Sequence, residues 1–288
     1  MTDTPTRILV LGASGMLGNA VLRVFAGTPG FDVTGAVRSA GSANQLAGHG
    51  ARIVTGLDAE SSDSLARVIA EARPDVVVNC VGLIKQLGNA GQVLAAVPIN
   101  TLLPHRLVQL TALAGARLVH VSTDCVFTGS TGGYVEADRA DATDVYGLSK
   151  FLGEVDAPHA ITLRTSIIGH ELGSANGLIG WFLSQSGSVK GFRRAIFSGL
   201  PTVELARVIR DHVLPHPELH GLYHVSAAPI AKYDLLRLAA EAYGRPTEIV
   251  PDDALVIDRS LDSTRFRAAT GYAPADWPAL VAAMRDFG

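Results

Sequence analysis

The sequence predicts an α/β protein: a Rossmann-type, doubly wound parallel sheet, followed by a small C-terminal α/β substrate domain. Three observations lead to this prediction. Short β-branched runs alternate with longer helical patterns, beginning with the strand expected over Arg7–Leu11. These runs are apolar on both sides, as strands covered by helices on both faces require. A glycine-rich turn ends the first run, where such sheets bind nucleotides.

The regular alternation fills the first part of the chain. The expected strands are Arg7–Leu11, Asp32–Val37, Ile53–Thr55, Asp75–Cys80, Arg117–Ser122 and Ala160–Arg164. The expected helices are Met16–Ala26, Ser61–Ala72, Pro98–Ala114 and Tyr146–Glu154. In Ser61–Ala72, for example, apolar side chains recur at helical spacing. Gly115 provides the stop signal for the helix before it.

The alternation weakens near residue 165, which divides the chain into two expected domains. Residues 1–165 form the Rossmann domain, completed by part of 199–226, and residues 166–288 form mainly a substrate-binding domain. Within the second domain, Leu235–Tyr243 has the pattern of a helix.

Composition excludes several classes of partner. The formal net charge of the 288 residues is −3, and no block of basic residues occurs. We therefore expect neither nucleic acid nor a membrane as partner. Neither a signal peptide nor a long apolar segment is found, and Cys80 and Cys125 lie in apolar runs as expected free thiols. These features favour the cytoplasm. No ligand cluster indicates a metal.

A glycine turn follows the first expected strand. Gly12 permits a tight turn, Gly15 lets backbone amides approach a pyrophosphate, and Gly18 lets the helix pack close to the sheet. The helix N-terminus adds unpaired N–H groups and partial positive charge. The residues expected to bind a dinucleotide here are Gly12, Ser14, Gly15, Met16, Leu17 and Gly18.

The end of the second strand indicates which dinucleotide is bound. NAD sites usually have an acidic residue here for the ribose hydroxyls, whereas an arginine accommodates the 2′-phosphate of NADP. Arg38 occupies this position, with no acid beside it. NADPH is therefore the predicted cofactor. Asp58, after the third strand, either contacts the adenine edge or caps the following helix.

Tyr146 and Lys150 form the expected catalytic pair. Four residues apart on a helix, they share one face, and a nearby ammonium is expected to lower the pKa of a tyrosine. A hydroxyl at the end of the preceding strand could donate to a substrate carbonyl. Thr123 and Ser122 compete for that role, and strand alternation lets only one of them face the site.

Together these motifs resemble the extended short-chain dehydrogenase/reductase superfamily. Within it, Ser122–Phe127, Gly133–Glu136 and Val145–Lys150 look most like segments of the dTDP-4-dehydrorhamnose reductase family. The resemblance is specific over roughly the first 170 residues. One departure is Val81–Gln86, where that family usually carries a segment containing Tyr-Thr.

The resemblance implies hydride transfer from NADPH to the C4 ketone of a nucleotide-linked 4-keto-6-deoxy sugar. Thr123, Tyr146 and Lys150 then take the family's catalytic roles, and Asp124 lies beside the substrate. The cofactor's nicotinamide ribose and carboxamide would meet two further segments. These segments are Asn79–Gly82, which includes Cys80, Val81 and Gly82, and Arg164–Ile168, which includes Ile167.

Cationic and aromatic side chains of the second domain are candidates for the rest of the substrate. Lys190 and Arg193 could bind a diphosphate and Trp181 a base, or they could form a solvated loop beside a core tryptophan. A homodimer is compatible with the sequence.

Two other functions stay open. One is an epimerase-reductase using Cys125 and His170, which resemble residues of GDP-fucose synthase. The other is a non-catalytic, NADP-binding regulatory subunit. A 4,6-dehydratase fits less well, because that family has Glu where Cys125 stands.

Overall fold

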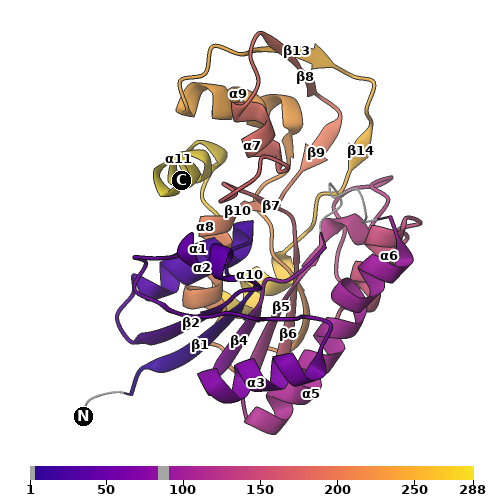
Figure 1. The fold of residues 1–288 in the computed structure, drawn as a ribbon. Helices are drawn as coiled ribbons and strands as arrows, with labels where there is room; N and C mark the ends of the chain where they lie inside the picture. Colours follow the sequence, from indigo (N-terminus) through magenta and orange to yellow (C-terminus); the bar gives the residue numbers. More distant parts are fainter. Residues whose placement is uncertain (1–3, 84–90) are drawn as a thin grey trace.

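A computed structural model describes residues 4–83 and 91–288 (Figure 1). At its centre lies a seven-stranded parallel sheet with the order β11-β6-β5-β4-β1-β2-β3. The strands are β1 (Thr6–Leu11), β2 (Phe31–Ala36), β3 (Arg52–Val54), β4 (Val76–Asn79), β5 (Arg117–Thr123), β6 (Ala160–Thr165) and β11 (Gly221–His224). The strand order reverses between β1 and β4, as in a doubly wound sheet. The predicted Rossmann-type fold is confirmed.

Helices cover both faces of the sheet because alternate side chains of each strand point to opposite sides. On one face, α1 (Met16–Ala26) and α8 (Thr202–Val208) pack in a core with Val10 and Val78. On the other face, α3 (Ser62–Ala72) and α5 (Leu103–Ala114) pack against strand residues such as Leu11. The apolar runs of the sequence therefore serve two separate cores.

The helix predicted over Pro98–Ala114 differs from the observed one. A short helix, α4 (Val93–Ala96), precedes it, and Val97–Leu102 forms a π-helix before α5 begins. The backbone N–H of Leu103 donates to the carbonyl of Pro98, five residues back. Pro104 lacks the N–H that an α-helix would direct to the carbonyl of Asn100. The prediction that this segment is helical is thus confirmed, but its first turns form a π-helix.

Most elements after β6 form a second group, which Figure 1 shows beyond one end of the central sheet, whereas α8, β11 and α10 (Thr264–Thr270) lie beside or within that sheet. The second group contains a parallel pair, a three-stranded sheet and several helices. The strands are β8 (Ser188–Phe192) with β13 (Glu248–Asp252), and β12 (Ile230–Ala231) with β9 (Ala195–Phe197) and β14 (Ile257–Asp258). The helices include α7 (Leu178–Leu183), α9 (Lys232–Ala242) and α11 (Trp277–Phe287).

The two parts of the chain are interleaved. β11 extends the central sheet by pairing with β6, Gly221 lying opposite Ile161. The guanidinium of Arg117 on β5 donates to three backbone carbonyls of residues 213–219, at 2.7 to 2.9 Å. Residues 202–224 therefore belong spatially to the layer around the sheet. In the described ranges, no helix has the length and apolarity needed to cross a membrane.

Candidate active site

The glycine turn lies at the switch point of the sheet. Gly12 adopts φ +75°, and a Cβ there would lie 3.0 Å from Cγ2 of Val81, which follows β4. A Cβ at Gly18 would overlap the carbonyl oxygen of Gly12, so only glycine lets α1 approach so closely. Gly15 is exposed and caps α1 without a side-chain hydrogen bond. The first-turn N–H groups of α1 therefore suit a phosphate.

Other residues predicted to bind the cofactor lie near this turn. Ser14 and Met16 are half-buried beside Gly15, and Leu17 packs in the core. After β4, Cys80 bonds through its N–H to the carbonyl of Leu11. Burial raises the pKa of the Cys80 thiol to about 12, so it remains protonated.

The segment after β4 continues toward the site. The side chain of Asn79 accepts a hydrogen bond from the backbone N–H of Val81 at 3.1 Å, and Gly82 is exposed. Of the departing segment noted in the sequence, Ile84, Lys85 and Gln86 lie outside the described residues.

Arg38 and Asp58, the two residues proposed to bind the adenosine end of the cofactor, have different surroundings in the structure. Arg38 is exposed after β2 and makes no hydrogen bond or ion pair with residues 4–83 or 91–288. Asp58 instead closes a local turn by accepting from the N–H of Glu60 at 2.9 Å. The N-cap of α3 is Ser61. Arg38 is therefore available to a 2′-phosphate, whereas the Asp58 carboxylate already has a structural role.

Helix α6 (Val145–Leu152) carries Tyr146 and Lys150. Asp144 caps it by accepting from the N–H of Gly147 at 2.8 Å. A Cβ at Gly147 would overlap the carbonyl oxygen of Cys125, so the helix packs directly on the turn that follows β5. This contact between backbones places Tyr146 beside the end of β5.

Thr123 faces Tyr146, whereas Ser122 points to the other side of β5. Burial raises the pKa of Tyr146, and the neighbouring hydroxyl of Thr123 opposes that rise. Thr123 also accepts from the N–H of Cys125 at 3.1 Å. Ser122 donates to the carboxylate of Glu154 at 2.7 Å. Strand alternation thus leaves Thr123 as the hydroxyl at the site.

Burial controls the protonation of the catalytic pair. The ammonium of Lys150 donates to the carbonyl of Val121 at 2.8 Å, and burial lowers the pKa of Lys150 to about 8. The same cause raises the pKa of Tyr146 above its usual range, with further contributions from Cys125 and Asp124. In this structure burial therefore outweighs the lowering expected from a nearby ammonium, and the phenol stays protonated and can act as an acid.

Two cations that the sequence analysis missed lie near Asp124. Burial raises the pKa of Asp124, and the charges of Arg259 and Lys232 oppose that rise. Arg259 donates to the carbonyl of Phe127 at 2.7 Å and contacts the sulfur of Cys125 at 3.8 Å. Lys232 is the first residue of α9, where a cation opposes the helix dipole. This unfavourable position of a lysine is the feature of the sequence that could have indicated a functional residue.

The cations predicted for the diphosphate are already paired. Lys190 lies 2.9 Å from Asp252, and Arg193 forms an ion pair with Asp253. All four residues lie on or beside the paired strands β8 and β13. Trp181 is 38% exposed on α7. Lys190 and Arg193 are therefore exposed cations that are already paired, and Trp181 is not a core residue.

Cys125 and His170 have different neighbours. The imidazole of His170 hydrogen-bonds to the hydroxyl of Tyr243 at 2.8 Å and borders a small cavity with Arg23. Cys125 lies against Arg259 instead. These two contacts are separate and do not join Cys125 to His170 as an epimerisation pair.

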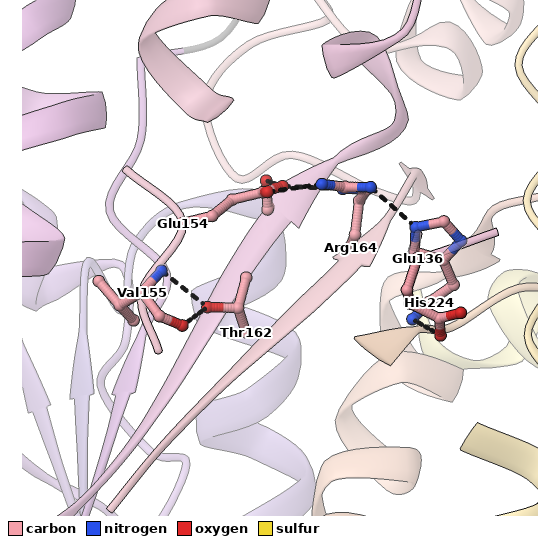
Figure 2. A network of polar contacts seen from close by, with 7 residues as sticks. Glu136, Glu154, Val155, Thr162, Arg164 and His224 are labelled. Atoms are coloured by element: carbon pink, nitrogen blue, oxygen red, sulfur yellow. Dashed lines mark hydrogen bonds and ion pairs between the residues drawn. The ribbon is translucent and has the colours of Figure 1, made fainter. Parts of the chain in front are cut away.

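Within the segment expected near the cofactor carboxamide, the side chain of Arg164 is bound to protein groups. Its side chain is 2% exposed and is held between Glu154 and His224 (Figure 2). A buried carboxylate offers a guanidinium a better partner than a neutral amide. Ile167, in contrast, is half-buried on the short strand β7 (Ile167–Ile168). In the part of the chain that the structure describes, no cluster of His, Cys, Asp or Glu could hold a metal ion.

Comparison with known proteins agrees with this geometry. The dTDP-4-dehydrorhamnose reductase of Aggregatibacter actinomycetemcomitans is 24% identical over 98% of this chain and 99% of its own. Methionine adenosyltransferase 2 subunit beta of Danio rerio is 28% identical over 84% of this chain and 75% of its own. The structure of the Bacillus anthracis dTDP-4-dehydrorhamnose reductase, in complex with NADP, superposes with a TM-score of 0.80 and 19% identity, covering 99% of this chain and 100% of that one.

The matching family model and the relatives place the chain in the extended short-chain dehydrogenase/reductase superfamily, in agreement with its doubly wound sheet. The family model described as the RmlD substrate binding domain matches residues 6–277. The chain belongs to that family, which confirms the resemblance to dTDP-4-dehydrorhamnose reductases.

Proposed function

We propose that the protein is an NADPH-dependent reductase of the C4 ketone of a nucleotide-linked 4-keto-6-deoxy sugar. The observation that carries the proposal is the packing of α6 on the turn after β5, which places Tyr146 beside Thr123, together with the buried Lys150 bound to the carbonyl of Val121. The reductases among the relatives support the substrate class. NADPH bound at the glycine turn would supply the hydride.

The side chains can do the remaining work. Tyr146 is protonated and donates its proton to the ketone oxygen, while Thr123 orients that oxygen. Lys150, held on the carbonyl of Val121, has further N–H groups for the ribose hydroxyls. Gly12, Gly15 and Gly18 would hold the diphosphate of the cofactor, and Arg38 its 2′-phosphate.

The direct test is an assay of NADPH oxidation with a panel of nucleotide 4-keto-6-deoxy sugars. NMR of the product gives its stereochemistry at C4. We expect turnover with at least one of these sugars. Tight NADPH binding without oxidation by any of them would contradict the proposal.

A regulatory subunit is the second candidate, because one relative is named as the beta subunit of a methionine adenosyltransferase. The retained Tyr146 and Lys150 favour catalysis over this role. The two functions differ in the same assay: a regulatory subunit would bind NADPH but leave it reduced.

Arg38→Asp is expected to shift cofactor preference from NADPH toward NADH by about 10- to 100-fold, the worth of one or two lost charge-assisted hydrogen bonds. The kcat/KM for each cofactor measures this shift. Arg237→Asp, on the exposed side of α9, is a control with the same charge change. An unchanged ratio in the Arg38 variant would mean that another residue reads the 2′-phosphate.

The diphosphate of the substrate could be bound by Lys232 with Arg259 or by Lys190 with Arg193. Matched lysine-to-methionine variants distinguish these two sites. Lys232 makes no hydrogen bond or ion pair within the described ranges, whereas Lys190 is bound to Asp252. We expect Lys232→Met to raise the KM for the nucleotide sugar about 10-fold. Lys190→Met should change it less than about two-fold, because that cation is exposed and already paired. The reverse result would favour the site predicted from the sequence.

A further inference from the structure

A buried polar network lies beside the catalytic residues, on the side of β5 that Thr123 does not face. Arg164 on β6 donates to both carboxylate oxygens of Glu154, from Nε at 2.8 Å and from Nη2 at 2.6 Å. Its remaining terminal nitrogen donates to Nε2 of His224 on β11 at 2.9 Å. Figure 2 shows Glu154, Arg164 and His224 in one row across the two strands.

The hydrogen bonds fix the tautomer of His224. Its Nδ1 lies 3.0 Å from the carbonyl of Tyr134, to which only an N–H can donate. Nε2 therefore carries no proton and accepts from Arg164. The backbone N–H of His224 donates to Glu136 at 2.8 Å. The neutral imidazole thus links Arg164 to the loop that follows β5.

Arg164 touches each segment that positions the catalytic groups. Through Glu154 it holds the chain just beyond α6 and, by the hydrogen bond from Ser122, the end of β5. Its guanidinium also lies over the ring of Phe127, 5.0 Å from the centroid. Phe127 stacks on Tyr134 at a centroid distance of 3.9 Å. One side chain therefore connects the helix of the catalytic pair with the strand and turn of Thr123.

Stability alone does not explain such a pair. A buried ion pair gains little over apolar side chains of the same volume, because both charges must lose their hydration. A buried pair adjacent to a catalytic site therefore suggests a role in function.

We propose that Glu154 and Arg164 are positioning residues: they hold the Tyr146–Lys150 helix against the strand of Thr123 and balance the charge beneath Lys150. The inference rests on the proposed reductase function. It adds residues that act through Lys150 and Tyr146 rather than on the substrate.

The charge balance follows from the groups that face Lys150. Glu154, four residues later, is the one carboxylate that raises the pKa of Lys150 against burial. From β5, His120 is buried and neutral, because burial and the Lys150 charge hold its pKa well below the usual value. Tyr146 is protonated, and the carbonyl of Val121 accepts from the ammonium. Because Arg164 binds both oxygens of Glu154, it offsets the charge that Lys150 would otherwise feel.

Removing the charge of Glu154 and removing that of Arg164 should therefore shift the pKa of Lys150 in opposite directions. Glu154→Gln removes the negative charge and leaves Arg164, so Lys150 loses its proton at lower pH. Arg164→Met leaves the negative charge unbalanced, so Lys150 keeps its proton to higher pH. We expect the basic limb of kcat/KM, and of NADPH affinity measured by fluorescence without sugar, to shift by on the order of one pH unit each way.

Two further variants separate charge from packing. Arg164→Lys keeps the positive charge but loses the paired hydrogen bonds to the two oxygens of Glu154. The basic limb of the kcat/KM profile should therefore stay near that of wild type while kcat falls. The double variant Glu154→Gln with Arg164→Met removes both charges, so its limb should also return toward wild type. It supplies the test if a single variant fails to fold.

The outcomes distinguish a failure of the positioning role of Glu154 and Arg164 from a failure of the proposed reductase function. Full turnover in Tyr146→Phe would overturn the reductase mechanism itself. A Tyr146-dependent enzyme whose basic limb stays fixed, or moves the same way in both single variants, would overturn the inference alone. If only the double variant folds, a limb displaced by a full unit would overturn it.

Discussion

Tyr146→Phe is expected to lower kcat by about 10²- to 10⁴-fold, the usual contribution of a positioned proton donor. The change removes one hydroxyl and keeps the ring, so α6 should pack as before. Lys150 and the glycine turn are untouched, and NADPH affinity should stay within about two-fold of wild type. Steady-state assays and fluorescence titration with NADPH measure the two quantities.

Tyr243→Phe is the matched control. Its hydroxyl bonds to His170, away from Thr123, so this variant should turn over at nearly the wild-type rate. Near wild-type rates in Tyr146→Phe would assign proton donation to another group. Equal losses in both variants would indicate a general effect of removing tyrosine hydroxyls on the fold.

Acidification from pH 6.5 to about 4 is expected to remove about 3 kcal/mol of the unfolding free energy through His224. Burial, followed by the charge of Arg164, lowers the pKa of His224 to about 4. Near pH 5 the unfolded chain therefore binds a proton at this histidine that the folded protein does not bind. The contribution is complete above the usual histidine pKa and is lost as the pH falls toward 4.

Denaturant unfolding at a series of pH values measures this loss. In His224→Gln an amide oxygen can still accept from Arg164 but does not titrate, so the curve should be flatter. The buried His120 also has a lowered pKa, so some acid sensitivity should remain. His220→Gln, at an exposed position, should leave the curve unchanged. A wild-type slope in the His224 variant would contradict the assignment.

The first part of the fold could be predicted closely because its signals are local. Met16–Ala26 is a helix with the predicted bounds, and β1 begins one residue before its predicted start. The π-helix over Val97–Leu102 could not be foreseen, because its sequence also suits an α-helix. Pro104 removes the N–H that would bond to the carbonyl of Asn100, but a proline near the start of a helix does not by itself predict a π-helix.

The site was predictable where strand and helix periodicity decide it. Alternation requires one of Ser122 and Thr123 to face Tyr146, and the structure selects Thr123. Pairing across long sequence separations carries no such local signal. Lys190 meets Asp252 only because β8 and β13 lie side by side. Likewise, a charge at Arg164 is visible in the sequence, but its partner is not.

The late strand of the central sheet has a consequence for synthesis on the ribosome. β6 pairs on one side with β5 and on the other with β11, about 60 residues further along the chain. A nascent chain that has emerged only through residue 165 leaves β6 as an unprotected edge. It also lacks His224, and with it one partner of Arg164. The central sheet can therefore be completed only after β11 has emerged, and until then its open edge is a site for misassociation.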